Sequence, residues 1–315
     1  MCPVNAEIKQ LAMADLDLGF FIIGAQKCAT SWLFYCLSEH AEIALPRRKR
    51  EVYYLGGAEH CQRGDAWFIS RYRSTRRRVR GDVSVEYLED PKSAAYLHRR
   101  FPSAKIVVSL RDPVDRAISA YFWTLRHGLI EERDVGAILS SLLKSGSASG
   151  HAHDFLSRGL YAERLNRFCE RYDRKQLYVL LFEHLRVEPM AVLGDLYRFL
   201  GVDPTFVPKS LHSKPKKNTY VASIIEMERY LGGAQPLRKL ADIFNQYVDR
   251  LGFQRAHPTL APELRAALNS FYALDLQELM LTLQSLPEAQ CPGLGSLTTI
   301  WPTVAALEPP ASKAS

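Results

Sequence analysis

Residues 20–33, FFIIGAQKCATSWL, decide the fold of this chain. Four apolar residues predict a short buried strand, Gly24 predicts a tight turn, and the apolar spacing that follows predicts a helix. A loop between a strand and a helix N-terminus makes an anion site, because free backbone N–H groups and the positive end of the helix dipole point to the same place. Lys27 adds a full charge there, and Thr30 and Ser31 add hydroxyl donors.

The position of the lysine separates this loop from the common nucleoside-triphosphate loop, in which Lys directly precedes Ser or Thr. Here Lys27 lies three residues before Thr30, and the second Gly of that pattern is missing. We therefore expect a loop that holds a phosphate with its lysine placed differently. The alternative is an ordinary strand–turn–helix with a surface lysine.

The composition indicates a globular protein. The chain has 315 residues, of which 47% are hydrophobic, enough for a proper core. No apolar run approaches the roughly 20 residues that cross a bilayer. Residues 1–19 contain no apolar signal-peptide core, so we expect a cytoplasmic protein without a transmembrane segment. The six cysteines show no zinc-ligand spacing, which favours free thiols in a reducing compartment.

The chain is basic, with 41 Lys and Arg against 34 Asp and Glu and a net charge of +7. Much of the excess lies in residues 47–50 and 71–80. Such runs are most often solvated faces. The alternatives are an anionic ligand or acceptor nearby, or nucleic acid.

Strands alternate with helices along most of the chain. Further buried strands are expected near residues 79–84, 104–110 and 176–182, and helices near residues 89–100, 113–122, 154–172, 189–200, 222–231, 236–250 and from 262 onward. This alternation predicts an α/β fold with a mostly parallel central sheet and helices on both faces. Residues 127–153 are expected to form a flexible loop or lid on the acceptor side.

The domain organisation follows from the same pattern. We expect residues 1–18 to be a lead-in, residues 19–286 to be a single domain, and residues 287–315 to be a draped or frayed tail rich in Pro, Ala, Gly and Ser. The core face of the last long helix is expected to contain Leu264, Leu268, Phe271 and Leu279.

The second informative stretch is residues 110–122, LRDPVDRAISAYF. Asp112 is a good helix N-cap and Pro113 suits the first helical position, so Arg111 ends a strand just before a helix. In open α/β sheets ligands bind at that edge. Ser119 lies two turns into the helix. A capped helix with a surface arginine is the alternative.

Together the two stretches resemble the sulfotransferase family, most closely the branch of the heparan sulfate sulfotransferases and their bacterial relatives. The opening pattern G-x-x-K-[GST]-G-T is met from Gly24 to Thr30 except at Ala29, and L-R-D-P-x-x-R-x-x-S-x-Y is met in full from residue 110 to 121. Three further elements of the family pattern are matched more weakly, at residues 51–55, 159–162 and 253–258. The sequence departs from the pattern at Val83 and at Phe253-Gln254, where the branch often has a Lys and a Lys-Gly.

The resemblance implies a P-loop-like three-layer fold and 3′-phosphoadenosine 5′-phosphosulfate (PAPS) as sulfuryl donor, with the bisphosphate PAP as product. It implies that the opening loop holds the 5′-phosphate, that Arg111 and Ser119 hold the 3′-phosphate, and that residue Tyr161 and the late motif contact the nucleotide. The donor-binding residues implied in this way are Lys27, Cys28, Ala29, Thr30, Ser31, Arg111, Ser119, Tyr161, Arg255, Ala256 and His257.

Two residues carry the chemistry that the resemblance implies. Lys27 stabilises the negative charge that grows on the leaving phosphate oxygen, so no metal is required. Glu51 resembles the general base that takes the acceptor proton; an ion pair with Arg50 or Lys49 is its other interpretation. The acceptor is expected to be a small molecule or a carbohydrate, with no nucleic-acid partner, and the sequence does not identify it.

Two other functions remain open from the sequence alone. A phosphate-loop kinase or nucleotide-binding protein would need Mg²⁺ and the order Gly-Lys-Ser/Thr, which this chain lacks. A non-enzymatic binder of nucleic acid or other polyanions would account for residues 71–80 but not for Arg111 together with Ser119.

Overall fold

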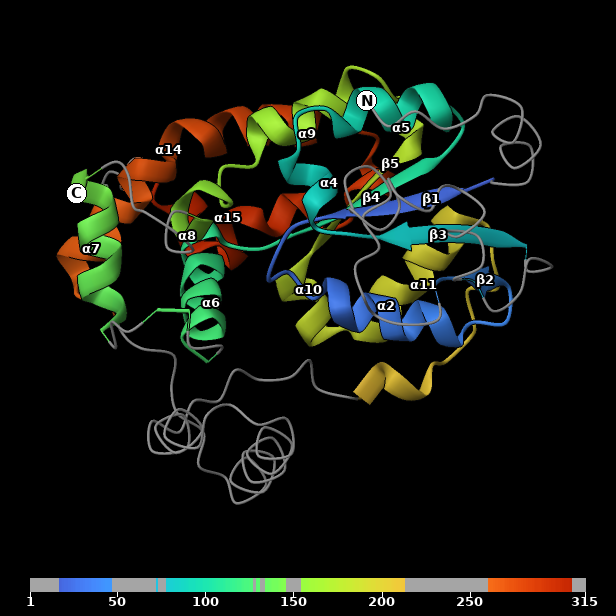
Figure 1. Cartoon of the computed structure of the whole chain (residues 1–315), viewed down its shortest axis with the longest axis horizontal. Helices are drawn as coiled ribbons and strands as arrows, with labels where there is room; N and C mark the ends of the chain where they lie inside the picture. The colour runs from blue at the N-terminus through green and yellow to red at the C-terminus, as the bar shows by residue number, and fades with distance from the viewer. Residues whose placement is uncertain are drawn as a thin grey trace, which may run out of the picture. The chain divides into compact units, whose positions relative to one another are not determined.

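The structure is a computed structural model, and it describes residues 17–46, 72, 78–126, 129–130, 134–145, 154–212 and 260–307 (Figure 1). The chain forms two compact units. Unit 1 takes in residues 1–112, 160–215 and 273–315, and unit 2 takes in residues 113–159 and 216–272. The expected helices near 222–231 and 236–250 lie outside the described residues.

Unit 1 is built on a five-stranded sheet with the order β2-β3-β1-β4-β5, in which every neighbouring pair is parallel. The strands are β1 (Phe20–Gly24), β2 (Ile43–Ala44), β3 (Val79–Val83), β4 (Lys105–Leu110) and β5 (Leu177–Leu181). The expected mostly parallel sheet is confirmed. Of these strands only β2 was not predicted from the sequence, because two residues are too few for a periodic signal.

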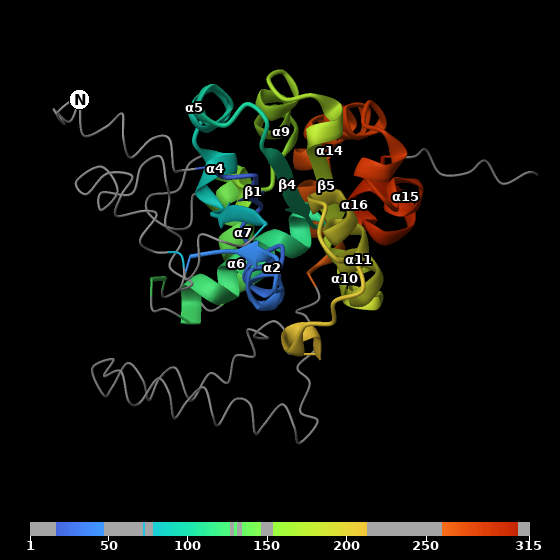
Figure 2. The same cartoon turned by 90° about the vertical axis from the view of Figure 1, so that its right-hand side faces the viewer.

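The helices of unit 1 cover both faces of its sheet (Figures 1 and 2). Unit 1 contains α2 (Thr30–Glu39), α4 (Glu86–Glu89), α5 (Ser93–Arg100), α9 (Ala162–Cys169), α10 (Phe182–Val187), α11 (Pro189–Leu200), α15 (Leu297–Ile300) and α16 (Pro302–Ala305). Unit 2 contains α6 (Pro113–Arg126), α7 (Val135–Ser145) and α8 (Asp154–Ser157). The long helix α14 (Pro262–Gln284) has residues in both units.

Alternate strand residues explain why both faces are covered. Phe20 and Ile22 of β1 pack in one cluster with residues of α2 and α11, whereas Phe21 points the other way. The Phe21 ring contacts the rings of Tyr87 in α4 and Phe101 after α5, at centroid distances of 5.6 and 5.3 Å. Strands that are buried on both faces need mostly apolar residues, which is the pattern that predicted β1, β4 and β5.

Three expectations about helices need correction. The described part of the expected loop at 127–153 contains the helix α7, whose first turn is capped by Asp134 Oδ1 accepting from the N–H groups of Gly136 and Ala137. The helix expected from residue 89 begins only at Ser93, because the side chain of Asp90 turns the chain by accepting from the N–H of Lys92. The helix expected over 154–172 is two helices, α8 and α9.

The C-terminal part of the chain differs from a frayed tail. Up to Leu307 the chain folds into short helical turns, and Trp301 is fully buried. On α14 the expected core residues Leu268 and Leu279 are buried, but Phe271 is 40% exposed and its neighbour Tyr272 is buried instead. In the described part of the chain no helix is both long and apolar enough to cross a bilayer.

Candidate functional site

The loop between β1 and α2 presents backbone donors at a helix N-terminus. Lys27 and Ala29 both have left-handed backbone conformations, with φ of 71° and 64°, and α2 begins at Thr30. No hydrogen bond among the described residues uses the N–H groups of Ala29, Thr30 or Ser31. These N–H groups and the helix dipole favour an anion at this place.

The neighbouring strand β4 fixes this loop. The N–H of Ala25 donates to the carbonyl of Ser109 at 2.8 Å, and Ser109 Oγ donates to the carbonyl of Cys28 at 2.7 Å. Ser109 and Cys28 are both fully buried. The Cys28 N–H already donates within the loop to the Ala25 carbonyl at 3.3 Å, so the N–H of Ala29 is the more available donor for an anion. This role of Ser109 was not predicted, because in the sequence Ser109 is simply one more residue of a buried strand.

The backbone of Ala29 gives a testable consequence. A non-glycine residue in the left-handed region costs roughly 1–2 kcal/mol, which a glycine at that position would avoid. Part of this gain in stability is lost, because Gly has more conformational freedom in the unfolded chain. We therefore expect Ala29→Gly to raise the free energy of unfolding by about 1 kcal/mol. Urea denaturation of the full chain measures this change.

The matched control is Ala191→Gly on the exposed side of α11, where the backbone is helical. There the same substitution should lower the free energy of unfolding by about 0.5–1 kcal/mol. A destabilisation by Ala29→Gly as large as that of the control would contradict the left-handed conformation of Ala29.

Arg111 lies at the end of β4, beside the loop. Its side chain is 5% exposed, and its guanidinium carbon lies 4.6 Å from the centre of the Phe182 ring. Within the described residues the guanidinium makes no hydrogen bond or ion pair, and its Nε is buried without a partner. A buried cation that lacks an anionic partner is expensive, so this geometry favours an anionic ligand.

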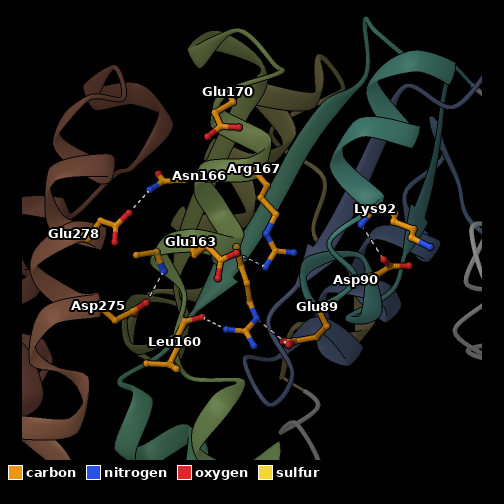
Figure 3. Close-up of polar contacts among 12 residues, drawn as sticks. Glu89, Asp90, Lys92, Leu160, Glu163, Asn166, Arg167, Glu170, Asp275 and Glu278 are labelled. Atoms are coloured by element: carbon orange, nitrogen blue, oxygen red, sulfur yellow. Dashed lines mark hydrogen bonds and ion pairs between the residues drawn. The ribbon is translucent and has the colours of Figure 1, made fainter.

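Tyr161 holds the backbone of Arg111. The Tyr161 hydroxyl is buried and donates to the Arg111 carbonyl at 3.0 Å. Asp275 of α14 in turn accepts from the N–H groups of Tyr161 and Ala162, at 2.8 and 3.1 Å, and so caps the start of α9. Figure 3 shows Asp275 at this end of α9, and shows Glu278, one turn further along α14, bound to Asn166. Burial raises the pKa of Asp275, and the two N–H donors oppose that shift.

The two anion-binding features share one edge of the sheet. β1 and β4 are adjacent and parallel, and Gly24 pairs with Val108 in the register. Lys27 follows Gly24 by three residues and Arg111 follows Val108 by three residues. Because the carboxyl ends of parallel neighbours meet at the same edge, the loop and Arg111 lie next to each other. The structure therefore brings together Lys27, Cys28, Ala29, Thr30, Ser31, Arg111 and Tyr161, all in unit 1.

The other predicted site residues lie in unit 2 or outside the described residues. Ser119 lies half-buried on α6 in unit 2. Glu51 and the late motif of Arg255, Ala256 and His257 lie outside the described residues. Among the residues that the structure describes, no group of three or more His, Cys, Asp or Glu could hold a metal ion.

Comparison with known proteins gives a consistent picture. Residues 18–230 match the family described as "Sulfotransferase domain". The bifunctional heparan sulfate N-deacetylase/N-sulfotransferase 1 of Caenorhabditis briggsae is 25% identical over 285 residues, which cover 87% of this chain and 30% of that protein. The bifunctional heparan sulfate N-deacetylase/N-sulfotransferase of Drosophila melanogaster is 29% identical over 230 residues, which cover 66% of this chain and 22% of that protein. This chain thus spans less than a third of the length of these two curated relatives.

A solved structure agrees with the sequence matches. The crystal structure of a sulfotransferase from Alicyclobacillus acidocaldarius superposes with a TM-score of 0.60 at 26% identity, over 87% of this chain and 99% of that one. The expected P-loop-like α/β fold is confirmed.

Proposed function

Because the chain belongs to the sulfotransferase family of enzymes, we propose that it transfers the sulfuryl group of PAPS to a hydroxyl or amine of a small-molecule or carbohydrate acceptor. One observation carries this proposal: a helix N-terminus and a buried arginine follow adjacent parallel strands, and among the described residues neither the N–H donors of that terminus nor the arginine has an anionic partner. Two anion sites side by side suit a nucleoside that is phosphorylated at both the 3′ and the 5′ positions.

The loop residues are proposed to bind the 5′-phosphate. The N–H groups of Ala29, Thr30 and Ser31 lie at the N-terminus of α2, where the dipole favours negative charge. Ser109 fixes the loop through the Cys28 carbonyl, so these donors are positioned before the ligand arrives. Lys27 adds the only full charge between β1 and α2.

Arg111 is proposed to bind the 3′-phosphate, with Ser119 as its partner by family resemblance. A guanidinium binds a phosphate through two parallel hydrogen bonds, which a lysine at the same place would not provide. Tyr161 is proposed to keep the Arg111 backbone in place through its hydroxyl. Contacts of Arg255, Ala256 and His257 with the nucleotide remain predictions.

The donor supplies an activated sulfuryl group, and the residues of this chain assist its in-line transfer. Glu51 is proposed to take the proton from the acceptor as the acceptor atom forms its bond to sulfur. The bond from sulfur to the 5′-phosphate oxygen breaks, and its electron pair stays on that oxygen. Lys27 stabilises the charge that develops there, as positioned cations do in phosphoryl transfer.

The relatives, the charge and the cysteines of the chain bear on the acceptor class and the location. The two named relatives are heparan sulfate enzymes, which favours a carbohydrate acceptor, and the basic runs at 47–50 and 71–80 would suit an anionic one. A cytoplasmic location remains a proposal; the four described cysteines are free and buried, as expected for a reducing compartment.

A thermal-shift comparison tests the proposed function. Adenosine 3′,5′-bisphosphate without metal should raise the midpoint of thermal unfolding, because a ligand that binds only the folded state stabilises it. ATP with Mg²⁺ should raise the midpoint less. An equal response to both nucleotides would favour the kinase alternative, and no response to either would favour a non-enzymatic polyanion binder.

A further inference from the structure

The segment Leu297–Ala305 packs against the ends of β4 and β5. Trp301 and Thr303 are both fully buried, and both make polar contacts at this place. Thr303 donates through its N–H and its hydroxyl to Asp112 Oδ2, at 3.1 and 2.6 Å. Trp301 Nε1 donates to Glu183 Oε2 at 2.8 Å. The C-terminal segment therefore contacts the residue that follows Arg111 and the residue that follows Phe182.

Both oxygens of Glu183 are occupied by these neighbours. Oε2 accepts from Trp301, and Oε1 accepts from the backbone N–H of Asp112 at 3.3 Å. Burial raises the pKa of Glu183, while these two hydrogen bonds and the charge of Arg111 act in the opposite direction. The Glu183 carboxylate is thus within electrostatic range of the Arg111 guanidinium but is held by other donors.

This arrangement matters because a carboxylate beside a buried guanidinium normally pairs with it. No ion pair joins Arg111 to Glu183 in the described structure, although both lie against the same residues, Asp112 and Phe182. A carboxylate that paired with Arg111 would compete with an incoming phosphate for the same donors.

We propose that Trp301 and Thr303 are positioning residues for the 3′-phosphate site: by holding Glu183 and Asp112, they keep the Glu183 carboxylate from pairing with Arg111. The inference rests on the proposed function, since it concerns the arginine assigned there to the 3′-phosphate. It gives the C-terminal segment a role in selecting the bisphosphorylated nucleotide over nucleotides that lack the 3′-phosphate.

The test uses Trp301→Phe in the full chain and compares two ligands by calorimetry. The substitution removes the indole N–H and frees one oxygen of Glu183. The dissociation constant for adenosine 3′,5′-bisphosphate should rise about tenfold, as expected for weakening one charge-assisted contact. The dissociation constant for adenosine 5′-monophosphate should stay within about twofold. Arg111→Gln gives the reference value for a site that has lost the 3′-phosphate contact.

The decisive variant is Trp301→Phe combined with Glu183→Gln. A neutral amide cannot neutralise Arg111, so the double variant should recover the wild-type preference for the bisphosphate to within about threefold. If Trp301 acted only by packing, the second change would not restore binding. The packing control is Trp32→Phe, another buried tryptophan, which should lower the melting temperature without changing the ratio of the two dissociation constants.

A milder variant covers the case in which Trp301→Phe does not fold. Thr303→Val removes only the hydroxyl bond to Asp112 and should reduce the preference for the bisphosphate about threefold, again with recovery by Glu183→Gln. An unchanged preference in both single variants, or failure of Glu183→Gln to restore it, would overturn this inference alone. A wild-type protein that shows no preference for the bisphosphate would instead overturn the proposed function.

Discussion

Replacing Lys27 with methionine is expected to lower the turnover number for sulfuryl transfer by about 10²- to 10³-fold. Methionine keeps most of the length of the side chain and removes its charge. The ammonium group is proposed to stabilise the phosphate oxygen that leaves sulfur. A fixed cation has its largest effect on charge that develops in the transition state. Steady-state kinetics with labelled PAPS and a competent acceptor measure the change.

Comparison of binding with turnover separates the two roles of Lys27. The lysine is also proposed to attract the 5′-phosphate of the product, so binding of adenosine 3′,5′-bisphosphate should weaken, but only by about tenfold. Lys27→Arg restores the charge with a different shape and should recover part of the turnover. A turnover number within about threefold of wild type in Lys27→Met would remove Lys27 from the chemical step.

Glu51→Gln is expected to lower the turnover number by about 10²- to 10⁴-fold, the usual range for loss of a general base. The amide has the same shape but cannot accept the acceptor proton. Binding of adenosine 3′,5′-bisphosphate should be unchanged, because the proposed role of Glu51 concerns the acceptor only. The same kinetic assay, together with calorimetry for the bisphosphate, tests both statements.

Glu163→Gln is the matched control, because Glu163 is an exposed residue of α9 whose partner is Arg167. It should leave turnover at the wild-type level. If Glu51→Gln behaved like this control, the role of base would pass to His127 or His60, the other candidates that the sequence offers.

The sheet and its functional edge could be predicted because their signals are local. The runs of β1, β4 and β5 are mostly apolar, and Gly24 and Asp112 mark the ends of the first two. A parallel arrangement of such strands places the residues after them at one edge, so the sequence alone predicts that Lys27 and Arg111 lie together.

The supporting residues could not be predicted, because their roles depend on contacts that are distant in sequence. Ser109 has the pattern of a strand residue, and only the partner strand reveals its bond to the Cys28 carbonyl. Trp301 lies among Pro, Ala and Gly residues that suggest a tail, and its contact with Glu183 spans 118 positions. Local composition carries no information about such partners.

The helix α7 was missed for a different reason. The Gly and Ser residues at 145–150 are typical of a flexible segment, and they directly follow the residues of α7. Val135, Leu139 and Leu142 do have helical spacing and are buried, and Asp134 is a favourable cap. The helical signal was therefore present in the sequence, but the Gly and Ser residues that follow it favoured the prediction of a loop.

The bonds between Thr303 and Asp112 also bear on how the protein is made, because these residues are 191 positions apart. At the usual rate of translation of 5–20 residues per second, about 10–40 s pass between the synthesis of the two residues. During this interval the nascent sheet can form while the end of β4 still lacks its final neighbours. Ribosome-bound chains should therefore reach a native-like sheet before the proposed nucleotide-binding edge of that sheet is complete, and this edge should be among the last parts to become resistant to proteolysis.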